Sequence, residues 1–250
     1  MMRYLRLIQH LSNWWLYLAV KFGMTRLDPL IFRTRDRVVV EVPRRLLHEF
    51  KEIFMEGSYT RGLELSLRDR PVIIDIGANA GFFTLFAAYR FPGATIFSYE
   101  PIGRNYRQLK RNADLNRSFR ILCFQKAVYG YCGDVTLSFD PGDSFTTSAS
   151  VFSNLDAKLK TVQVPCDSLT DIFDEHRIER CSLLKLDCEG AEFEILYNCP
   201  VDYLYRIDQM AIEVHGGTTA NQNMASLKNY LSSVDFKTRQ YAGHMLWAWR

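Results

Sequence analysis

The sequence lacks the marks of a metal-binding, redox-active or collagen-like protein. Its six cysteines form no Cys-x-x-Cys pair and no Cys/His cluster with zinc spacing, so neither a zinc site nor a thioredoxin-like dithiol is expected. Fourteen glycines and eight prolines in 250 residues are too few for a collagen-like chain. Free, buried thiols are typical of a reducing compartment, and we therefore expect a cytoplasmic protein.

Long apolar runs are also missing. The most apolar stretch, Trp14–Val20, lies within residues 1–22, where charged and polar residues interrupt it well short of the roughly 18 apolar residues of a membrane span. No small-residue cleavage site follows it, so a secretory signal is not expected. Residues 1–22 instead predict one basic, aromatic amphipathic helix. We favour packing of this helix on its own domain; the alternative is peripheral contact with the inner face of an anionic membrane.

Net charge is small as well. A balance of +3 is too little for a nucleic-acid-wrapping surface, and no nucleic-acid partner is expected. The first 50 residues hold nine basic and four acidic residues, a balance of +5, which leaves −2 for the other 200. The basic character is therefore a local property of the N-terminal region.

What is present suffices for one sizeable core. The chain is 48% hydrophobic, and its length is that of a single large α/β domain. Residues 31–33 and 38–42 predict a hairpin ended by Pro43, and apolar residues at helical spacing predict a short helix that stops at Gly57. We therefore separate residues 1–70, a helical and hairpin extension packed on the core, from a domain of residues 71–250.

From Pro71 onward, short apolar runs alternate with helical stretches. Repeated strand-helix units are typical of a parallel sheet covered by helices, so they predict an α/β fold. The expected pairs are 72–76 with 82–89, 94–99 with 104–115, 183–186 with 191–197, and 210–214 with 224–234; residues 235–241 and 245–249 predict an antiparallel hairpin at the sheet edge.

Two stretches depart from this alternation. Residues 121–128 predict another buried strand, and residues 129–164, rich in Gly, Ser, Thr and Asp, predict an inserted hairpin or lid. The aromatic residues of this insertion are candidates for a wall of an acceptor pocket, with an ordinary surface hairpin as the alternative. They are Phe139, Phe145 and Phe152.

The most informative stretch is the turn Asp75–Gly81, between a buried strand and a helix. Glycines there allow a ligand to approach the backbone at the helix N-terminus. Glu100 ends the next apolar strand, where its carboxylate can accept hydrogen bonds from both ribose hydroxyls of an adenosine. Together the turn and the acid predict a nucleoside pocket.

The turn also indicates which cofactor is bound. A dinucleotide pyrophosphate needs a middle glycine, whereas Asn79 stands there, so a nicotinamide-dependent oxidoreductase is disfavoured. The carboxylate of Asp75 at the strand end suits a positive ligand, such as an ammonium or a sulfonium. S-adenosylmethionine carries both groups and no phosphate.

In order and spacing, these motifs resemble the FkbM family of S-adenosylmethionine-dependent methyltransferases. The resemblance covers about residues 50–215. The matching segments are residues 72–84, Tyr99–Pro101, the strand end Ala127–Val128, residues 184–192 and Ile212–His215, and Phe50–Tyr59 is similar to the family's lead-in.

This resemblance implies a fold and a cofactor. The expected fold is the class I methyltransferase sheet, Rossmann-like and mostly parallel, with seven strands of which the C-terminal one is antiparallel. The expected cofactor is S-adenosyl-L-methionine. The cofactor-binding residues implied are Asp75, Gly77, Asn79, Gly81 and Glu100.

Two further strand ends carry candidate catalytic residues. Ligands of open α/β sheets bind beyond the carboxyl ends of the strands, so Asp187 with Glu189, and Glu213 with His215, should face the transferred methyl group. His215 could take a proton from an acceptor hydroxyl, with Asp187 holding the methionine ammonium or orienting the imidazole. We take Asp187, Glu189 and His215 as the catalytic candidates.

Other roles for these residues stay open at this point. His215 could make only a structural hydrogen bond, and Glu189 and Glu192 could cap the helix after Gly190. A magnesium site of Asp187, Glu189 and Glu213 is a further alternative, and we assign no metal.

The expected function is methyl transfer from S-adenosylmethionine to a hydroxyl, with a sugar or a surface glycan as the acceptor. Methylation of a secondary metabolite is one alternative, and N-methylation is a second. A non-catalytic, cofactor-binding adaptor at a membrane surface, held by residues 1–22, is a third. The sequence fixes neither the acceptor's identity nor the oligomeric state.

Overall fold

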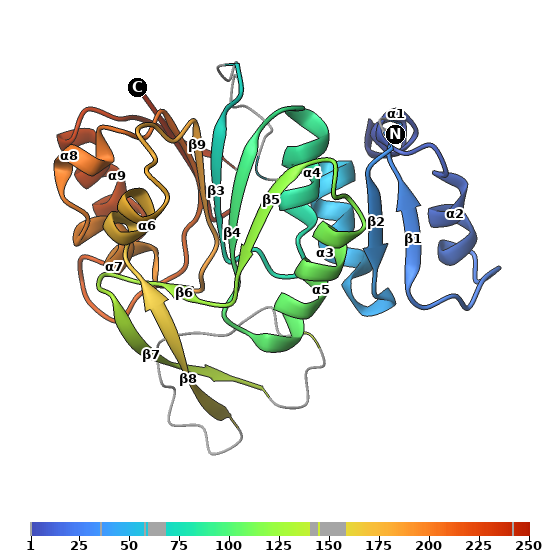
Figure 1. Ribbon diagram of the computed structural model, residues 1–250, viewed down its shortest axis with the longest axis horizontal. Helices are drawn as coiled ribbons and strands as arrows, with labels where there is room; N and C mark the ends of the chain where they lie inside the picture. The colour runs from blue at the N-terminus through green and yellow to red at the C-terminus, as the bar shows by residue number, and fades with distance from the viewer. Residues whose placement is uncertain are drawn as a thin grey trace.

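The computed structural model of the protein describes the chain except for residues 1, 36, 58, 60–68, 141–144, 146–158 and 242. An N-terminal extension precedes the main sheet and lies at one side of the molecule (Figure 1). It consists of α1 (Met2–His10), α2 (Trp15–Lys21), β1 (Leu30–Arg33), β2 (Val39–Val42), the 3-10 turn η1 (Arg44–Leu46), α3 (Leu47–Lys51) and the π-helical turn η2 (Glu52–Glu56).

A seven-stranded sheet forms the centre, in the order β11-β12-β10-β9-β3-β4-β5. All strands run parallel except β12, which pairs antiparallel with both β10 and β11. This is the class I methyltransferase topology that the sequence predicts. The strands are β3 (Val72–Ile76), β4 (Thr95–Tyr99), β5 (Arg120–Phe124), β9 (Leu183–Leu186), β10 (Gln209–Glu213), β11 (Lys237–Tyr241) and β12 (Met245–Trp249).

Helices cover both faces of this sheet (Figure 1). Alternate residues of β3 show the division, because Ile74 packs with the α6, α7 and α9 side and Ile73 with the α4 side. The helices are α4 (Phe82–Arg90), α5 (Gly103–Asp114), α6 (Leu169–Glu175), α7 (Glu192–Tyr197), α8 (Val201–Leu204) and α9 (Met224–Ser233).

The predicted strand over 121–128 is wrong as a single buried element. Its first part is β5, the partly exposed edge strand of the large sheet. Its last two residues form β6 (Ala127–Val128), which belongs to a separate three-stranded sheet with β8 (Lys160–Asp167) and β7 (Gly133–Phe139). The chain thus leaves the large sheet after Phe124, at the carboxyl edge of the strands.

The insertion contains the predicted hairpin, because β7 and β8 pair antiparallel from Gly133 opposite Cys166 to Phe139 opposite Lys160. In Figure 1 this hairpin lies below the carboxyl ends of the large sheet. Most of the stretch between its strands, including Phe152, lies outside the described residues. A lid role for the insertion therefore stays a prediction.

The single helix expected over residues 1–22 is two helices. Leu11 forms a bridge with Thr34, and the Asn13 side chain exchanges hydrogen bonds with the backbone of Ile31 and Arg33 at 2.8 Å each. These contacts to β1 interrupt the helix between α1 and α2. Of the polar residues that interrupt the apolar run, Ser12 and Asn13 lie at the break between the helices.

Described residues of the extension pack on the rest of the protein. Leu7, Leu11 and Leu16 are buried in one cluster with β1, β2 and α3, and this cluster includes Phe82 and Phe86 of α4. Among the described residues, no helix combines the length and hydropathy that a membrane crossing requires.

Candidate active site

The turn after β3 is shaped by left-handed backbone conformations. Gly77, Asn79 and Gly81 have φ values of +72°, +50° and +83°. A side chain at Gly77 would place its Cβ 1.7 Å from the backbone oxygen of Asp187, so only glycine fits this approach to the end of β9. The turn therefore brings the ends of β3 and β9 into direct contact.

Glu100 joins this turn to the end of β4. Its buried carboxylate accepts hydrogen bonds from the backbone N–H of Asn79 at Oε2 and of Ile102 at Oε1, both 2.9 Å. Burial raises the pKa of Glu100 to about 7, although the two backbone donors lower it. Each oxygen keeps acceptor capacity, so a bound ribose could still donate to it.

Asp75 has a different surrounding from the one that we expected. Its fully buried carboxylate accepts a hydrogen bond from the Thr84 hydroxyl at 2.6 Å and lies 3.3 Å from the ammonium of Lys185. It is not among the described residues that line the neighbouring hollows. The positive partner of Asp75 in the structure is therefore Lys185, and direct contact with a cofactor stays a prediction.

A hollow with about 620 Å³ of unfilled space, part of it open to solvent, lies at the carboxyl ends of β3, β4 and β9. The predicted residues Gly77, Asn79 and Glu100 line it. We refer to it as the cofactor hollow. Its other walls include Ile76, Tyr99, Pro101, Ile102, Asn105, Lys126, Ala127, Val128, Leu137, Asp187, Cys188, Glu189 and Ala191.

A second, larger hollow of about 1350 Å³ adjoins it, and we refer to it as the acceptor cleft. One wall comes from the N-terminal extension, with His48, Glu49, Glu52 and Ile53 of α3 and η2. The other walls include Tyr59, Phe82, Phe83, Lys185, Glu213, Gly243, His244 and Met245. The two hollows share Gly77, Asn79, Asp187 and Glu189.

The predicted aromatic wall from the insertion stays a prediction, because none of the described residues that line the acceptor cleft belongs to the insertion and Phe152 lies outside the described residues. We expected aromatic residues of the insertion, but Phe139 packs in the small cluster of the three-stranded sheet. Phe145 lies against the cluster of the extension, with its ring 5.0 Å from the Arg104 guanidinium. Within the described part of the insertion, Leu137 reaches the cofactor hollow.

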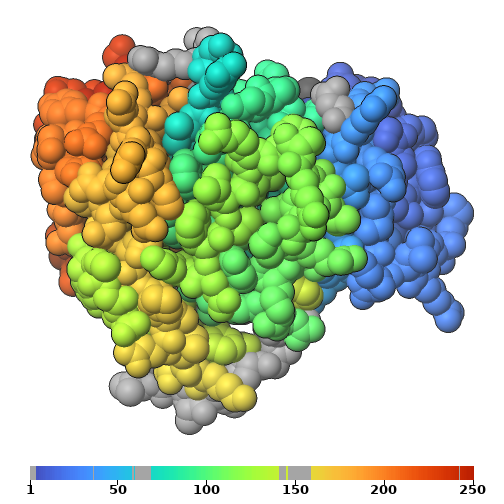
Figure 2. Space-filling view, viewed as in Figure 1, coloured from blue at the N-terminus to red at the C-terminus, as the bar shows by residue number. Residues whose placement is uncertain are grey.

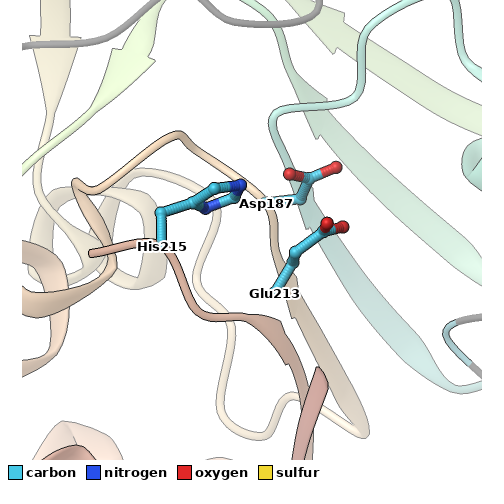
Figure 3. Close-up of side chains that lie close together, drawn as sticks. All are labelled: Asp187, Glu213 and His215. Carbon is cyan, nitrogen blue, oxygen red and sulfur yellow. The ribbon is translucent and has the colours of Figure 1, made fainter. Parts of the chain in front are cut away.

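Asp187, Glu213 and His215 converge from the ends of β9 and β10 (Figure 3). The Tyr59 hydroxyl donates a hydrogen bond to Asp187 Oδ2 at 2.7 Å and lies 2.8 Å from Glu213 Oε2. One hydroxyl hydrogen cannot serve both carboxylates. Burial and the charge of Asp187 raise the pKa of Glu213, while the Tyr59 hydroxyl and the charges of His215 and Lys185 lower it.

His215 lies behind Glu189 and against Glu192. Its Nδ1 is 2.8 Å from the fully buried Glu192 carboxylate, and its Nε2 is 3.6 Å from Glu189 Oε2. Burial lowers the pKa of His215, but the hydrogen bond to Glu192 and the charges of Glu192 and Glu189 outweigh it and raise the pKa to about 9. The imidazole is therefore positively charged at neutral pH.

Glu189 lines both hollows, as Asp187 does, and lies beside this imidazolium. Burial raises its pKa to about 7, while the charge of His215 lowers it. Its φ of +53° is unusual for a residue with a side chain, and such strain is often found at functional sites. His215, in contrast, is not among the described residues that line either hollow.

Among the residues that the structure describes, one group of side chains could hold a divalent cation. Ligand atoms of Asp187, Glu213 and His215 lie within 4.8 Å of one another. Tyr59 already bridges the two carboxylates, and Lys185 lies 3.5 Å from Asp187. Because these groups compensate the carboxylates, we assign no metal to them.

Three residues of the site escaped the sequence analysis as functional candidates. Lys185 offered a signal, since it is the one charged residue of an otherwise apolar strand. Glu192 was considered only as a helix cap, whereas it orients His215 in place of Asp187. Tyr59 offered no signal, because it reaches Asp187 across 128 positions of the chain.

Residues 75–238 match the family profile described as the methyltransferase FkbM domain, which is more than half of the chain. The chain belongs to this family. Its curated relatives include "31-O-demethyl-FK506 methyltransferase FkbM" of Streptomyces tacrolimicus, 30% identical over 194 residues that cover 66% of this chain and 73% of the relative. "Methyltransferase 1" of Beauveria bassiana is 27% identical over 202 residues, 74% of this chain and 79% of the relative. The protein is thus a methyltransferase of the FkbM family.

The fold agrees with a solved member of the same family. The structure of methyltransferase FkbM from Methylobacillus flagellatus KT aligns with a TM-score of 0.53 at 16% identity. The alignment covers 82% of this chain and 54% of the other, so this FkbM protein spans about half the length of that relative.

Proposed function

We propose that this FkbM methyltransferase uses S-adenosyl-L-methionine in the cofactor hollow and methylates a hydroxyl oxygen in the acceptor cleft. The supporting observation is that two hollows meet at Asp187 and Glu189. Methyl transfer needs a donor and an acceptor in line, and two hollows that meet at one point allow this.

The cofactor hollow fits the chemistry of this cofactor. The Glu100 carboxylate suits the two ribose hydroxyls, with Gly77 and Asn79 providing close backbone walls. Asp187 and Glu189 supply negative charge where the cationic part of the cofactor would lie. In this proposal Asp75 does not contact the cofactor. Its hydrogen bond with Thr84 instead stabilises the turn that does.

When bound, S-adenosylmethionine supplies a methyl group attached to a positively charged sulfur. A hydroxyl oxygen can bond to the methyl carbon and displace the sulfur from it, without a covalent enzyme intermediate. Glu189 takes the hydroxyl proton. A pKa of about 7 makes this carboxylate a suitable base near neutral pH, since a general base is most effective when its pKa is close to the working pH. The charged His215, held by Glu192, orients Glu189 and keeps it ionised.

The acceptor class that we propose is a sugar or glycan hydroxyl. The cleft places carboxylates beside the aromatic rings of Phe82 and Phe83, and such walls suit the polar edges and apolar faces of a sugar. The Streptomyces relative's name refers to O-methylation of another molecule, which supports an oxygen acceptor more strongly than it supports a sugar.

The test has two stages. Calorimetric titration with S-adenosylmethionine and with its demethylated product should show binding, and labelled cofactor should then transfer its methyl group to members of a panel of sugars, glycans and hydroxylated metabolites. Labelling of amines alone would replace O-methylation with N-methylation. Binding without transfer to any acceptor would favour the adaptor hypothesis, and no binding to folded protein would remove the proposed cofactor.

A further inference from the structure

Exposed apolar side chains are concentrated in one short region. Of eleven large hydrophobic side chains that are exposed, six lie between residues 5 and 27. The other five are scattered over the rest of the described chain. Four of the six belong to α2 and the turn that follows it: Trp15 is 58% exposed, Phe22 67%, Met24 70% and Leu27 59%.

These side chains lie on α2 or on the residues directly after it. Trp15 and Phe22 are seven residues apart and so point to the same side of α2. The opposite side is fixed, because Leu16 is buried in the core of the extension. We refer to Trp15, Phe22, Met24 and Leu27 as the apolar edge. In Figures 1 and 2 this part of the chain forms the outer edge of the blue N-terminal region, away from the sheet.

Positive charge accompanies the apolar edge. Between residues 2 and 35 the sequence has six Lys and Arg residues and a single acid, Asp28, a balance of +5. The Lys21 ammonium lies 5.7 Å from the centre of the Phe22 ring, and Arg26 is exposed between Met24 and Leu27. Arg35 is exposed at the end of α1, where it donates to the backbone oxygens of Ile8 and Gln9.

We propose that the apolar edge docks on an anionic membrane surface. A second copy of this chain would bring the same positive charges together across the contact, whereas an anionic lipid surface complements them. Trp and Phe side chains favour the interfacial region of a bilayer, with basic residues toward the headgroups. This inference is independent of the proposed methyl transfer. The sequence analysis considered membrane contact through all of residues 1–22, whereas the proposal assigns it to the four residues of the apolar edge.

Vesicle sedimentation tests the proposal with the full chain. Vesicles of phosphatidylcholine alone are compared with vesicles of phosphatidylcholine and phosphatidylglycerol in equal parts. We expect binding to the mixed vesicles, with a loss of about fivefold per basic residue in Lys21→Gln and Arg26→Gln. Trp15→Ser with Phe22→Ser should weaken binding by at least about tenfold.

A matched control is the pair Leu115→Ser with Val201→Ser, which removes exposed apolar side chains from α8 and from the end of α5. This variant should bind the mixed vesicles as the unaltered protein does. Equal binding of the Trp15/Phe22 variant, with an unchanged thermal melt, would overturn the proposal. So would a dimer in light scattering that the same variant converts to a monomer, because the edge would then be covered by a second copy.

Discussion

Two hollows meet at Asp187 and Glu189, and their walls are built in different ways. The cofactor hollow is made largely of strand ends and the turns that follow them, and its key acid, Glu100, is held by two backbone N–H groups. The acceptor cleft is made of side chains from elements far apart, held by contacts such as that of Tyr59 with Asp187. Substitutions change a wall made of side chains more readily than a wall made of backbone. This difference suits a family of enzymes that share one cofactor and act on many acceptors.

The first way to break this comparison is to remove the buried cation Lys185, which lines the acceptor cleft. Lys185 is buried, donates to the backbone oxygen of Gly77 at 2.7 Å and compensates Asp75. Lys185→Met should lower the free energy of unfolding by about 3–5 kcal/mol, because a buried carboxylate loses its partner. Urea unfolding would measure this, and adding Asp75→Asn should recover part of the loss. No recovery in the double variant would contradict the pairing.

Substitution at the junction should separate chemistry from binding. Glu189→Gln keeps the size of the side chain but removes the base, and kcat should fall by about a hundredfold or more. The dissociation constant of S-adenosylmethionine, measured by calorimetry, should change far less than kcat, since Asp187 keeps its negative charge at the same junction. A variant with unaltered kcat would show that Glu189 is not the proton acceptor.

The backbone-built wall has its own test at Glu100. Glu100→Ala leaves the N–H groups of Asn79 and Ile102 without their acceptor and removes the proposed ribose contact. Cofactor affinity should fall by about a hundredfold, the cost of losing charge-assisted hydrogen bonds in a buried site. Glu100→Gln, which keeps acceptor oxygen at one position, should lose less. Equal affinity in all three proteins would place the ribose elsewhere.

The smallest expected effect is a shift in pH dependence. Glu189 must be ionised and His215 charged, so kcat/KM should rise with pH through about 7 and fall through about 9. In His215→Gln the positive charge that lowers the pKa of Glu189 is gone, so the rising limb should move to higher pH and the falling limb should disappear. Glu192→Gln removes a charge that raises the pKa of His215, so its falling limb should move to lower pH. If the limbs of the pH profile stay in place in these variants, other groups are responsible for them.

The contrast between the walls also explains what the sequence could predict. Strands such as β3 and β9 are short runs, apolar except for Asp75 and Lys185, that end next to turns, so the sheet and its antiparallel last strand were predicted correctly. The cofactor side depends on local features of this kind. Glu100 follows its strand directly, and its place at the cofactor hollow is fixed by the parallel arrangement of β3 and β4.

The rest depends on contacts that spacing does not encode. Nothing in the sequence indicates that Tyr59 reaches Glu213, 154 positions away, or that α3 lines the acceptor cleft. The break between α1 and α2 follows from pairing of Asn13 with the hairpin, which is a tertiary effect. The partners of Asp75 and His215 likewise needed the arrangement in space, because charge compensation acts between whichever groups the fold brings together.

The N-terminal extension supplies a wall of the acceptor cleft through α3 and η2, and its outer edge carries the exposed apolar residues of α2. One contiguous piece of chain therefore lies both at the cleft that we propose for the acceptor and at the surface that we propose for lipid. An exchange of residues 1–57 with a relative would alter substrate choice and cellular address in a single recombination event, while the sheet and its cofactor turn stayed the same.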